Sequence, residues 1–150
     1  MKKILSTFAL VLFAITLSLG LVGCKKIKKQ NRPEYIVSKT YKFKSFEGTG
    51  FEEEAYAQQK ETFSATTFTF TENKVIQFLD GRETPSEYFY KMNKYRRLTL
   101  YKNEDMKKPI DSGYDFLEFS FYFYQDYKTF FFKITDSNAG TTAKGTFVVD

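Results

Sequence analysis

The chain has 150 residues, enough for one domain, and a formal net charge of +5 from 23 Lys and Arg against 18 Asp and Glu. It contains no histidine, no tryptophan and a single cysteine. These counts exclude a Ser-His or Cys-His nucleophile pair, a histidine zinc site, an internal disulfide and a thiolate cluster around a metal.

The N-terminal segment has the layout of a secretory signal peptide. Lys2 and Lys3 open the chain, and an uncharged, largely apolar stretch follows from Ile4 to Val22. A positive start before a short apolar run is typical of an export signal. The run also reaches the lower limit of a membrane-spanning helix, so a retained transmembrane anchor is the alternative.

The end of this segment, Leu21-Val22-Gly23-Cys24, resembles the lipobox of bacterial lipoproteins. The resemblance implies that residues 1–23 are a signal peptide removed before Cys24, and that the Cys24 thiol receives a diacylglycerol. A lipidated thiol also avoids the unwanted pairing that one free cysteine risks in an exported protein. We therefore expect a protein held on a bacterial membrane outside the cytoplasm, with the choice between cell membrane and outer membrane left open.

Residues 24–33 read as a basic tether behind this anchor. Five of the nine residues after Cys24 are cationic, and Pro33 ends the run. Beyond it, 16 Lys and Arg remain against 18 Asp and Glu, which gives residues 34–150 a net charge of −2. The tether either presses against anionic headgroups or is a solvated linker. Nucleic-acid binding is not expected, because the folded part is not basic.

The remainder, residues 34–150, reads as one aromatic, strand-rich domain. Phe and Tyr supply 27 of the 127 residues from Cys24 onward, a composition that suits half-buried strands. A first strand is predicted around Tyr35–Phe43. The segment Glu47–Glu61 follows, and its acidic and alanine-containing part predicts a short helix.

Two hairpins are predicted next, each with a three-residue loop that carries an Asn able to adopt a left-handed backbone. The loops are Glu72–Lys74 and Asn93–Tyr95. The first hairpin sets Phe68 and Phe70 against Ile76 and Phe78, and the second sets Tyr88 and Tyr90 against Leu98 and Leu100.

The C-terminal third holds the clearest pattern. After an exposed loop over Lys102–Gly113, hydrophobic residues alternate along two strands joined by a four-residue loop at Gln125–Lys128. The predicted pairs are Phe123 with Phe130, Phe121 with Phe132, and Phe119 with Ile134. Only this register collects the pure hydrophobes on one face. A last strand is predicted at Lys144–Val149.

About eight antiparallel strands in an up-and-down order close most simply into a small all-β barrel. The pattern is similar to bacterial lipocalin-like lipoproteins, and the resemblance lies mainly in residues 68–75 and 90–100. It implies successive hairpins that follow a loop-covered first strand. A two-sheet β-sandwich is the alternative, because strand number alone does not separate the two folds.

No catalytic or metal site is expected, and no cofactor. The run Glu52-Glu53-Glu54 is consecutive, so its carboxylates cannot all face one site. Asp136–Gly140 has oxygen ligands without the spacing of a calcium loop, which favours a turn.

Binding is the function that the sequence favours, with two alternatives. In the first, the barrel holds a small apolar ligand or a packed core, and the same rings serve either purpose: Phe119, Phe121, Phe123, Phe130 and Phe132. In the second, a lipoprotein with an immunity, adhesion or assembly role has a solid core and contacts an envelope protein. Its surface is then Tyr88, Tyr90, Tyr95, Arg96 and Arg97, or those residues are an ordinary solvated face.

Overall fold

The structure is a computed structural model that describes residue 34 and residues 36–149. The predicted signal peptide, the lipidation site Cys24, the tether and Tyr35 lie outside the described residues. In the described part of the chain, no helix combines the length and the apolar character needed to cross a membrane.

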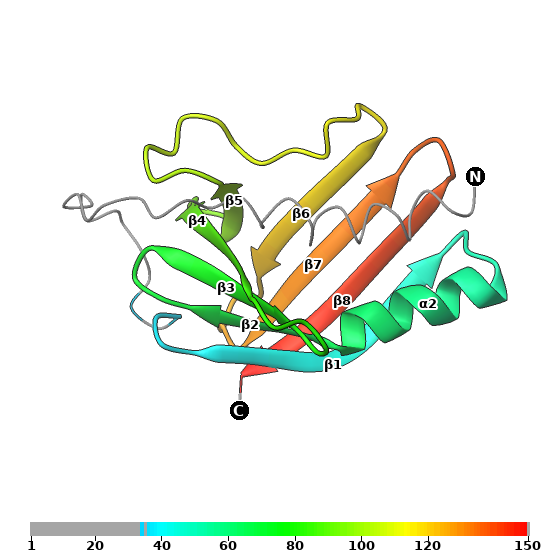
Figure 1. The fold of residues 1–150 in the computed structure, drawn as a ribbon, viewed down its shortest axis with the longest axis horizontal. Helices are drawn as coiled ribbons and strands as arrows, with labels where there is room; N and C mark the ends of the chain where they lie inside the picture. The colour runs from blue at the N-terminus through cyan, green and yellow to red at the C-terminus, as the bar shows by residue number, and fades with distance from the viewer. Residues whose placement is uncertain (1–33, 35, 150) are drawn as a thin grey trace.

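The domain is a closed barrel of eight antiparallel strands with one helix (Figure 1). Each strand pairs with the next along the chain, and β8 returns to pair with β1. The elements are β1 Thr40–Thr49, α2 Glu53–Ser64, β2 Thr66–Phe70, β3 Lys74–Leu79, β4 Ser86–Met92, β5 Arg97–Tyr101, β6 Leu117–Phe123, β7 Thr129–Asp136 and β8 Thr141–Val149. The prediction of an all-β up-and-down barrel is confirmed, and the alternative of a β-sandwich is wrong.

The β6–β7 hairpin has the register predicted from its sequence. Phe123 pairs with Phe130, Phe121 with Phe132, and Phe119 with Ile134. The N–H of Tyr124 donates to the carbonyl of Thr129 at 2.9 Å, so the loop between the strands is Gln125–Lys128, the four residues predicted. Alternation and the four-residue loop agree here, and a slip by one residue would have turned Phe130 and Phe132 to the solvent side.

The predicted register of β2 and β3 is wrong by one residue. Phe70 pairs with Val75 and Phe68 with Gln77, whereas Ile76 and Phe78 were expected in those places. Since side chains alternate between the two faces of a strand, the shift turns the whole of β3 over. Val75 and Gln77 are buried, and Phe78 is 44 % exposed.

The turn between these strands explains the error. The N–H of Thr71 donates to the carbonyl of Lys74 at 2.8 Å, and the N–H of Lys74 donates to Thr71 Oγ1 at 3.0 Å. The loop is therefore the two residues Glu72 and Asn73, one fewer than predicted. Loop length sets hairpin register, so the missing residue moves every pair along β3 by one position.

The β4–β5 loop is displaced without a change of face. Met92 pairs with Leu98, and the loop is Lys94–Arg96 instead of Asn93–Tyr95. Its left-handed residue is Arg96, with φ 63°, and not the asparagine. The strand pairing moves by two residues, so the side chains expected inside the barrel are still inside.

The first strand, the helix and the last strand occur in the predicted order with shifted ends, and β1 extends to Thr49, into the segment expected to lie outside the strands. β1 begins at Thr40, since Val37 lies in a turn, and β8 begins at Thr141. The helix α2 lies beside β1 in Figure 1. Its buried Phe63 packs against Phe46 and Phe132, with ring centroids 5.1 and 5.3 Å apart, and so attaches the helix to the barrel.

One part of the interior is filled by rings, which we call the aromatic cluster: Tyr41, Phe70, Tyr90, Phe123 and Phe130. Phe70 is at its centre, with ring centroids 5.2 to 5.6 Å from the other four. Most of these contacts are edge-to-face, the arrangement that aromatic quadrupoles favour. The Tyr41 hydroxyl donates to the carbonyl of Tyr127 at 2.6 Å, so its polar atom is satisfied.

Candidate functional site

The barrel is least tightly closed between β5 and β6, a place we call the β5–β6 seam. These strands pair only at Arg97–Tyr122 and Leu98–Phe121. Beyond Leu98 a segment of the long loop between β5 and β6 lies along β5 instead. The N–H of Ile110 donates to the carbonyl of Leu100 at 2.8 Å. The loop runs across the upper side of the barrel in Figure 1.

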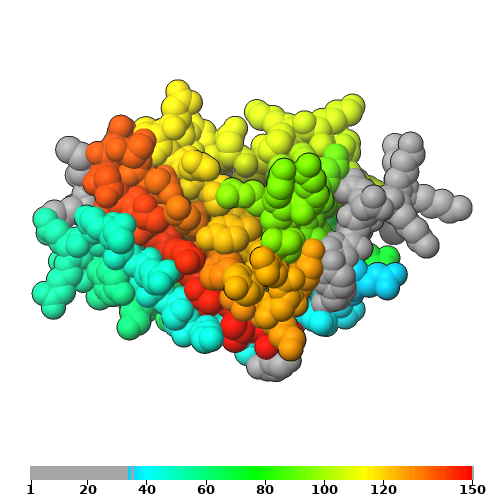
Figure 2. All heavy atoms as spheres, turned by 180° about the vertical axis from the view of Figure 1, so that it is seen from behind, coloured from blue at the N-terminus to red at the C-terminus, as the bar shows by residue number. Residues whose placement is uncertain are grey.

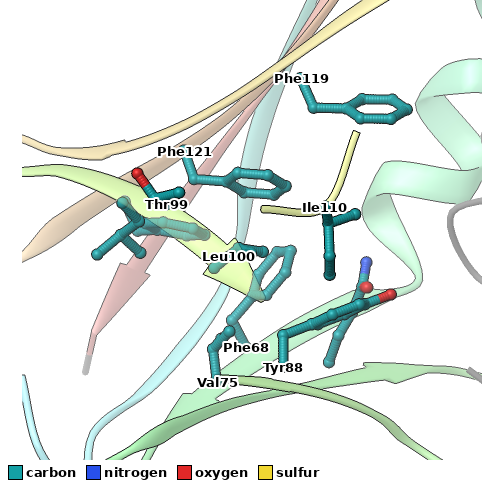
Figure 3. Close-up of a pocket in the computed structure, with 11 residues that line it drawn as sticks. Phe68, Val75, Tyr88, Thr99, Leu100, Ile110, Phe119 and Phe121 are labelled. Atoms are coloured by element: carbon teal, nitrogen blue, oxygen red, sulfur yellow. The ribbon is translucent and has the colours of Figure 1, made fainter. Parts of the chain in front are cut away.

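Inside the seam is a cavity of about 170 Å³ (Figure 3). It draws side chains from β2 to β7 and from the loop, and none from β1 or β8. The lining residues are Phe68, Val75, Gln77, Tyr88, Leu98, Thr99, Leu100, Ile110, Phe119, Phe121 and Phe130. Ile110 lies among Phe119, Leu100 and Tyr88, so the loop completes the wall that the short β5–β6 pairing leaves open.

The lining is mainly aromatic and aliphatic and includes no charged side chain. The carboxamide of Gln77 is its most deeply buried polar group. The Gln77 side chain is only 2 % exposed, and its Nε2 has no hydrogen-bond partner. A buried donor without a partner costs free energy, and a hydrogen bond to an acceptor would remove that cost.

The phenol of Tyr88 is the titratable group of the lining. Burial raises the pKa of Tyr88 to about 12, although a hydrogen bond with Ser86 and the positive charge of Arg82 oppose the shift. Tyr88 therefore stays protonated and neutral near pH 7. The cavity lining is thus mainly apolar and carries no charge at physiological pH.

The phenylalanines predicted to line a ligand site separate into two groups. Phe119, Phe121 and Phe130 line the cavity. Phe123 and Phe132 do not line it, because both are buried in packed surroundings. Phe123 belongs to the aromatic cluster, and Phe132 stacks on Phe121 with centroids 4.7 Å apart and rings 7° from parallel.

The predicted partner surface is only partly on the surface. Tyr88 and Tyr90 are buried, so their assignment to that surface is wrong. Both point inward on β4, and the Tyr90 hydroxyl donates to the carbonyl of Thr71 at 2.9 Å. Tyr95 and Arg97 are exposed and Arg96 is partly exposed. The reason for the error is that tyrosine serves equally well in a core, where one hydrogen bond satisfies its hydroxyl.

Sequence reasoning missed the two lining residues that distinguish this site, Gln77 and Ile110. Gln77 was placed outside because the predicted β2–β3 loop was one residue too long. The available signal was Thr71 directly before Glu72-Asn73, because a threonine hydroxyl can accept a turn N–H, as Thr71 Oγ1 does from Lys74. Ile110 lies in a loop without periodicity; the signal was an isolated aliphatic residue in a polar stretch.

Other groups considered from the sequence form no site in the described residues. Glu52, Glu53 and Glu54 are all exposed. Asp136 is buried, and its Oδ1 accepts a hydrogen bond from the N–H of Ala139 at 2.9 Å, as in an ordinary turn. Over residue 34 and residues 36–149, no three His, Cys, Asp or Glu side chains come together to hold a metal ion.

Comparisons of the chain with protein-family models, with curated proteins and with solved structures gave no match. The functional proposal is therefore built on the cavity and on the sequence.

Proposed function

We propose that this protein is a lipid-anchored, extracytoplasmic binding protein for a small apolar ligand, and not an enzyme. The cavity inside the β5–β6 seam carries this proposal. It is lined by aromatic and aliphatic side chains from six strands and one loop, with a single deeply buried carboxamide. Small-molecule sites are typically apolar hollows with a few placed polar groups.

The size of the cavity limits the ligand. A volume of about 170 Å³ is close to that of an apolar protein cavity, on the order of 150 Å³, that takes up benzene. A single ring with a short substituent fits this space. An intact phospholipid or a haem does not, unless the loop between β5 and β6 moves away.

The location rests on the N-terminal sequence. Leu21-Val22-Gly23-Cys24 resembles the lipobox of bacterial lipoproteins, and it follows the charged start and apolar run of an export signal. Two or more acyl chains hold a protein on a membrane far more firmly than one, because each buried methylene adds about 0.8 kcal/mol. We propose that Cys24 bears this anchor and that the basic tether separates the barrel from the bilayer.

Benzene is a direct probe of the cavity. We expect benzene, titrated onto the purified full-length chain, to shift the methyl NMR signals of Leu100, which lines the cavity. The methyl signals of Leu117, which is buried on β6 outside the cavity, should stay in place. Equal shifts at both residues, or none at either, would refute a specific cavity site.

A cavity-filling variant with a matched control strengthens this test. Ile110→Phe adds a ring inside the cavity and should weaken benzene binding at least about tenfold. Ile76→Phe adds the same ring on β3 at a position that does not line the cavity, and should leave binding unchanged. The melting temperature of each variant verifies that it is folded.

The anchor has its own test. Mass spectrometry of the protein recovered from membranes should show the mass of a chain that begins at Cys24 and carries acyl groups. Cys24→Ser should leave an uncleaved precursor without these groups. A wild-type protein with intact residues 1–23 and a free thiol would contradict the anchor without bearing on the cavity.

A second candidate function is contact with another envelope protein. Tyr95 and Tyr124 are 65 % and 56 % exposed. Their loops meet at one end of the barrel, because the N–H of Phe123 donates to the carbonyl of Arg96 at 3.0 Å (Figure 2). Exposed tyrosines beside arginine are common in protein interfaces.

Site-specific photocrosslinking in intact cells tests this candidate. A crosslinker at position 95 should give one discrete adduct, and a crosslinker at the position of Phe78 on β3, which is also exposed, should give none. Adducts of the same size from both positions, or from neither, would speak against a partner at this end of the barrel.

A further inference from the structure

Gln77 sets one unsatisfied hydrogen-bond donor into the wall of a mainly apolar cavity. Its side chain is 2 % exposed, it lines the cavity, and its Nε2 has no partner. An ordinary core position on β3 would carry an aliphatic residue such as the neighbouring Val75, which is buried on the same face. A glutamine here is a cost to folding that an acceptor on a ligand would remove.

The charge of the surroundings restricts that acceptor to a neutral one. None of the lining residues is Lys, Arg, Asp or Glu. A carboxylate brought into this cavity would lose its hydration and find no cation among the lining residues, because Arg82, whose charge acts on Tyr88, does not line the cavity. This exchange is strongly unfavourable. A ketone, aldehyde, ester or amide oxygen accepts a hydrogen bond without that penalty.

We propose that the ligand class is a neutral, ring-sized molecule whose carbonyl oxygen accepts a hydrogen bond from Gln77 Nε2. The inference rests on the proposed function, because it names the ligand of the same cavity. The volume of about 170 Å³ admits one ring and a short substituent, and the aromatic walls contributed by Phe68, Phe119 and Phe121 suit a flat hydrocarbon body.

Three probes of nearly equal shape test the proposal: acetophenone, ethylbenzene and benzoate. Acetophenone carries the carbonyl oxygen, ethylbenzene lacks it, and benzoate replaces it with a charged group. Each is titrated onto the purified full-length chain, and the Leu100 methyl signals report occupation of the cavity. We expect acetophenone to bind about fivefold more tightly than ethylbenzene, the effect of one hydrogen bond, and benzoate to bind at least about tenfold more weakly than acetophenone.

The variant Gln77→Leu keeps the side-chain size and removes the donor. It should bind ethylbenzene at least as tightly as the wild-type chain does, and the preference for acetophenone should disappear. The matched control is Gln59→Leu on α2, since Gln59 is also buried and also has an unpartnered side-chain atom, yet does not line the cavity. Gln59→Leu should keep the fivefold preference, which separates the role of Gln77 from a general effect of removing a buried amide.

The outcomes distinguish this inference from the function on which it rests. If ethylbenzene and acetophenone bind equally to the wild-type chain, or if Gln77→Leu keeps the preference, the inference is overturned while an apolar ligand site stands. Tight benzoate binding would likewise overturn the neutral class. If neither neutral probe shifts the Leu100 signals, the proposed function fails as well.

Discussion

Around Phe70 the barrel interior is packed with aromatic rings, whereas around Gln77 it encloses a cavity of about 170 Å³. The two regions share the same strands: β2 contributes Phe70 to the first and Phe68 to the second. They differ in how the surrounding strands pair. The lesson is that closing a barrel and filling it are separate requirements, since a closed set of strands still leaves space where its side chains do not meet.

Strand pairing explains where that space lies. β1 and β8 pair along their length, from Tyr41–Val149 to Thr49–Thr142. β5 and β6 separate after Leu98–Phe121, and a loop residue, Ile110, takes the place of a strand neighbour. A loop supplies fewer inward side chains than a strand, so the interior beside the β5–β6 seam is incompletely filled.

The largest expected effect comes from breaking the packed region. Phe70→Ala should lower the free energy of unfolding by about 3–5 kcal/mol, because Phe70 is fully buried and touches four other rings. Urea denaturation followed by circular dichroism measures the loss. Phe78→Ala, at an exposed position, should change stability by less than about 1 kcal/mol. Similar losses for both would show that the aromatic cluster is not close-packed.

A smaller effect is expected where α2 meets the barrel. A Cβ added at Gly145 on β8 would run into the ring of Phe63 and lie 2.8 Å from Phe147. Gly145→Ala should therefore cost about 2 kcal/mol by overpacking. In a Phe63→Ala background the same substitution should cost much less, because the main clash is gone. An undiminished cost in the double variant would place the strain elsewhere in β8.

Alkaline pH should destabilise both regions, each through a buried tyrosine. Burial raises the pKa of Tyr88 beside the cavity from an ordinary 10 to about 12 and also raises the pKa of Tyr41 in the aromatic cluster. Between these pH values the unfolded chain has lost the Tyr88 proton and the folded chain keeps it, so stability falls as pH rises from 10 to 12. Tyr88 contributes roughly 1 kcal/mol per pH unit to this fall.

The variant Tyr88→Phe isolates that contribution. Urea denaturation between pH 10 and pH 12 should show a shallower loss of stability than in the wild-type chain, with no change in slope below pH 9. Tyr95→Phe, at an exposed position, should leave the slope unchanged. Parallel slopes for the wild-type chain and Tyr88→Phe would mean that Tyr88 is not protected by burial.

The smallest effect on stability is expected at the seam. Ile110→Ala should cost about 1 kcal/mol, because Ile110 is only partly buried and lies in a loop. It should also enlarge the cavity, so that naphthalene, which has two fused rings, binds more tightly than it does to the wild-type chain, as followed by the Leu100 methyl signals. A loss as large as that of Phe70→Ala would show that the loop belongs to the core and would remove the contrast between the two regions.

Whether a predicted hairpin register was correct depended more on the predicted loop length than on the pattern of hydrophobic residues. The β6–β7 register was correct because alternation and a four-residue loop agreed. The β2–β3 register was wrong because Ile76 and Phe78 are apolar and were expected to face inward. The two-residue turn instead turns Val75 and Gln77 inward. Of the candidate site, Phe119, Phe121 and Phe130 could be named in advance, and Gln77 could not.

What the sequence determined by itself is local: the strand number, the barrel order, the helix, the presence of a long loop after β5 and the best hairpin. These depend on periodicity and turn residues within a few positions along the chain. Only the tertiary structure decided that β5 and β6 separate, that Ile110 closes the seam, and that Gln77 faces the remaining space. The reason is that a cavity is the difference between the volume enclosed by eight strands and the volume of the side chains that reach it, and no single segment contains either quantity.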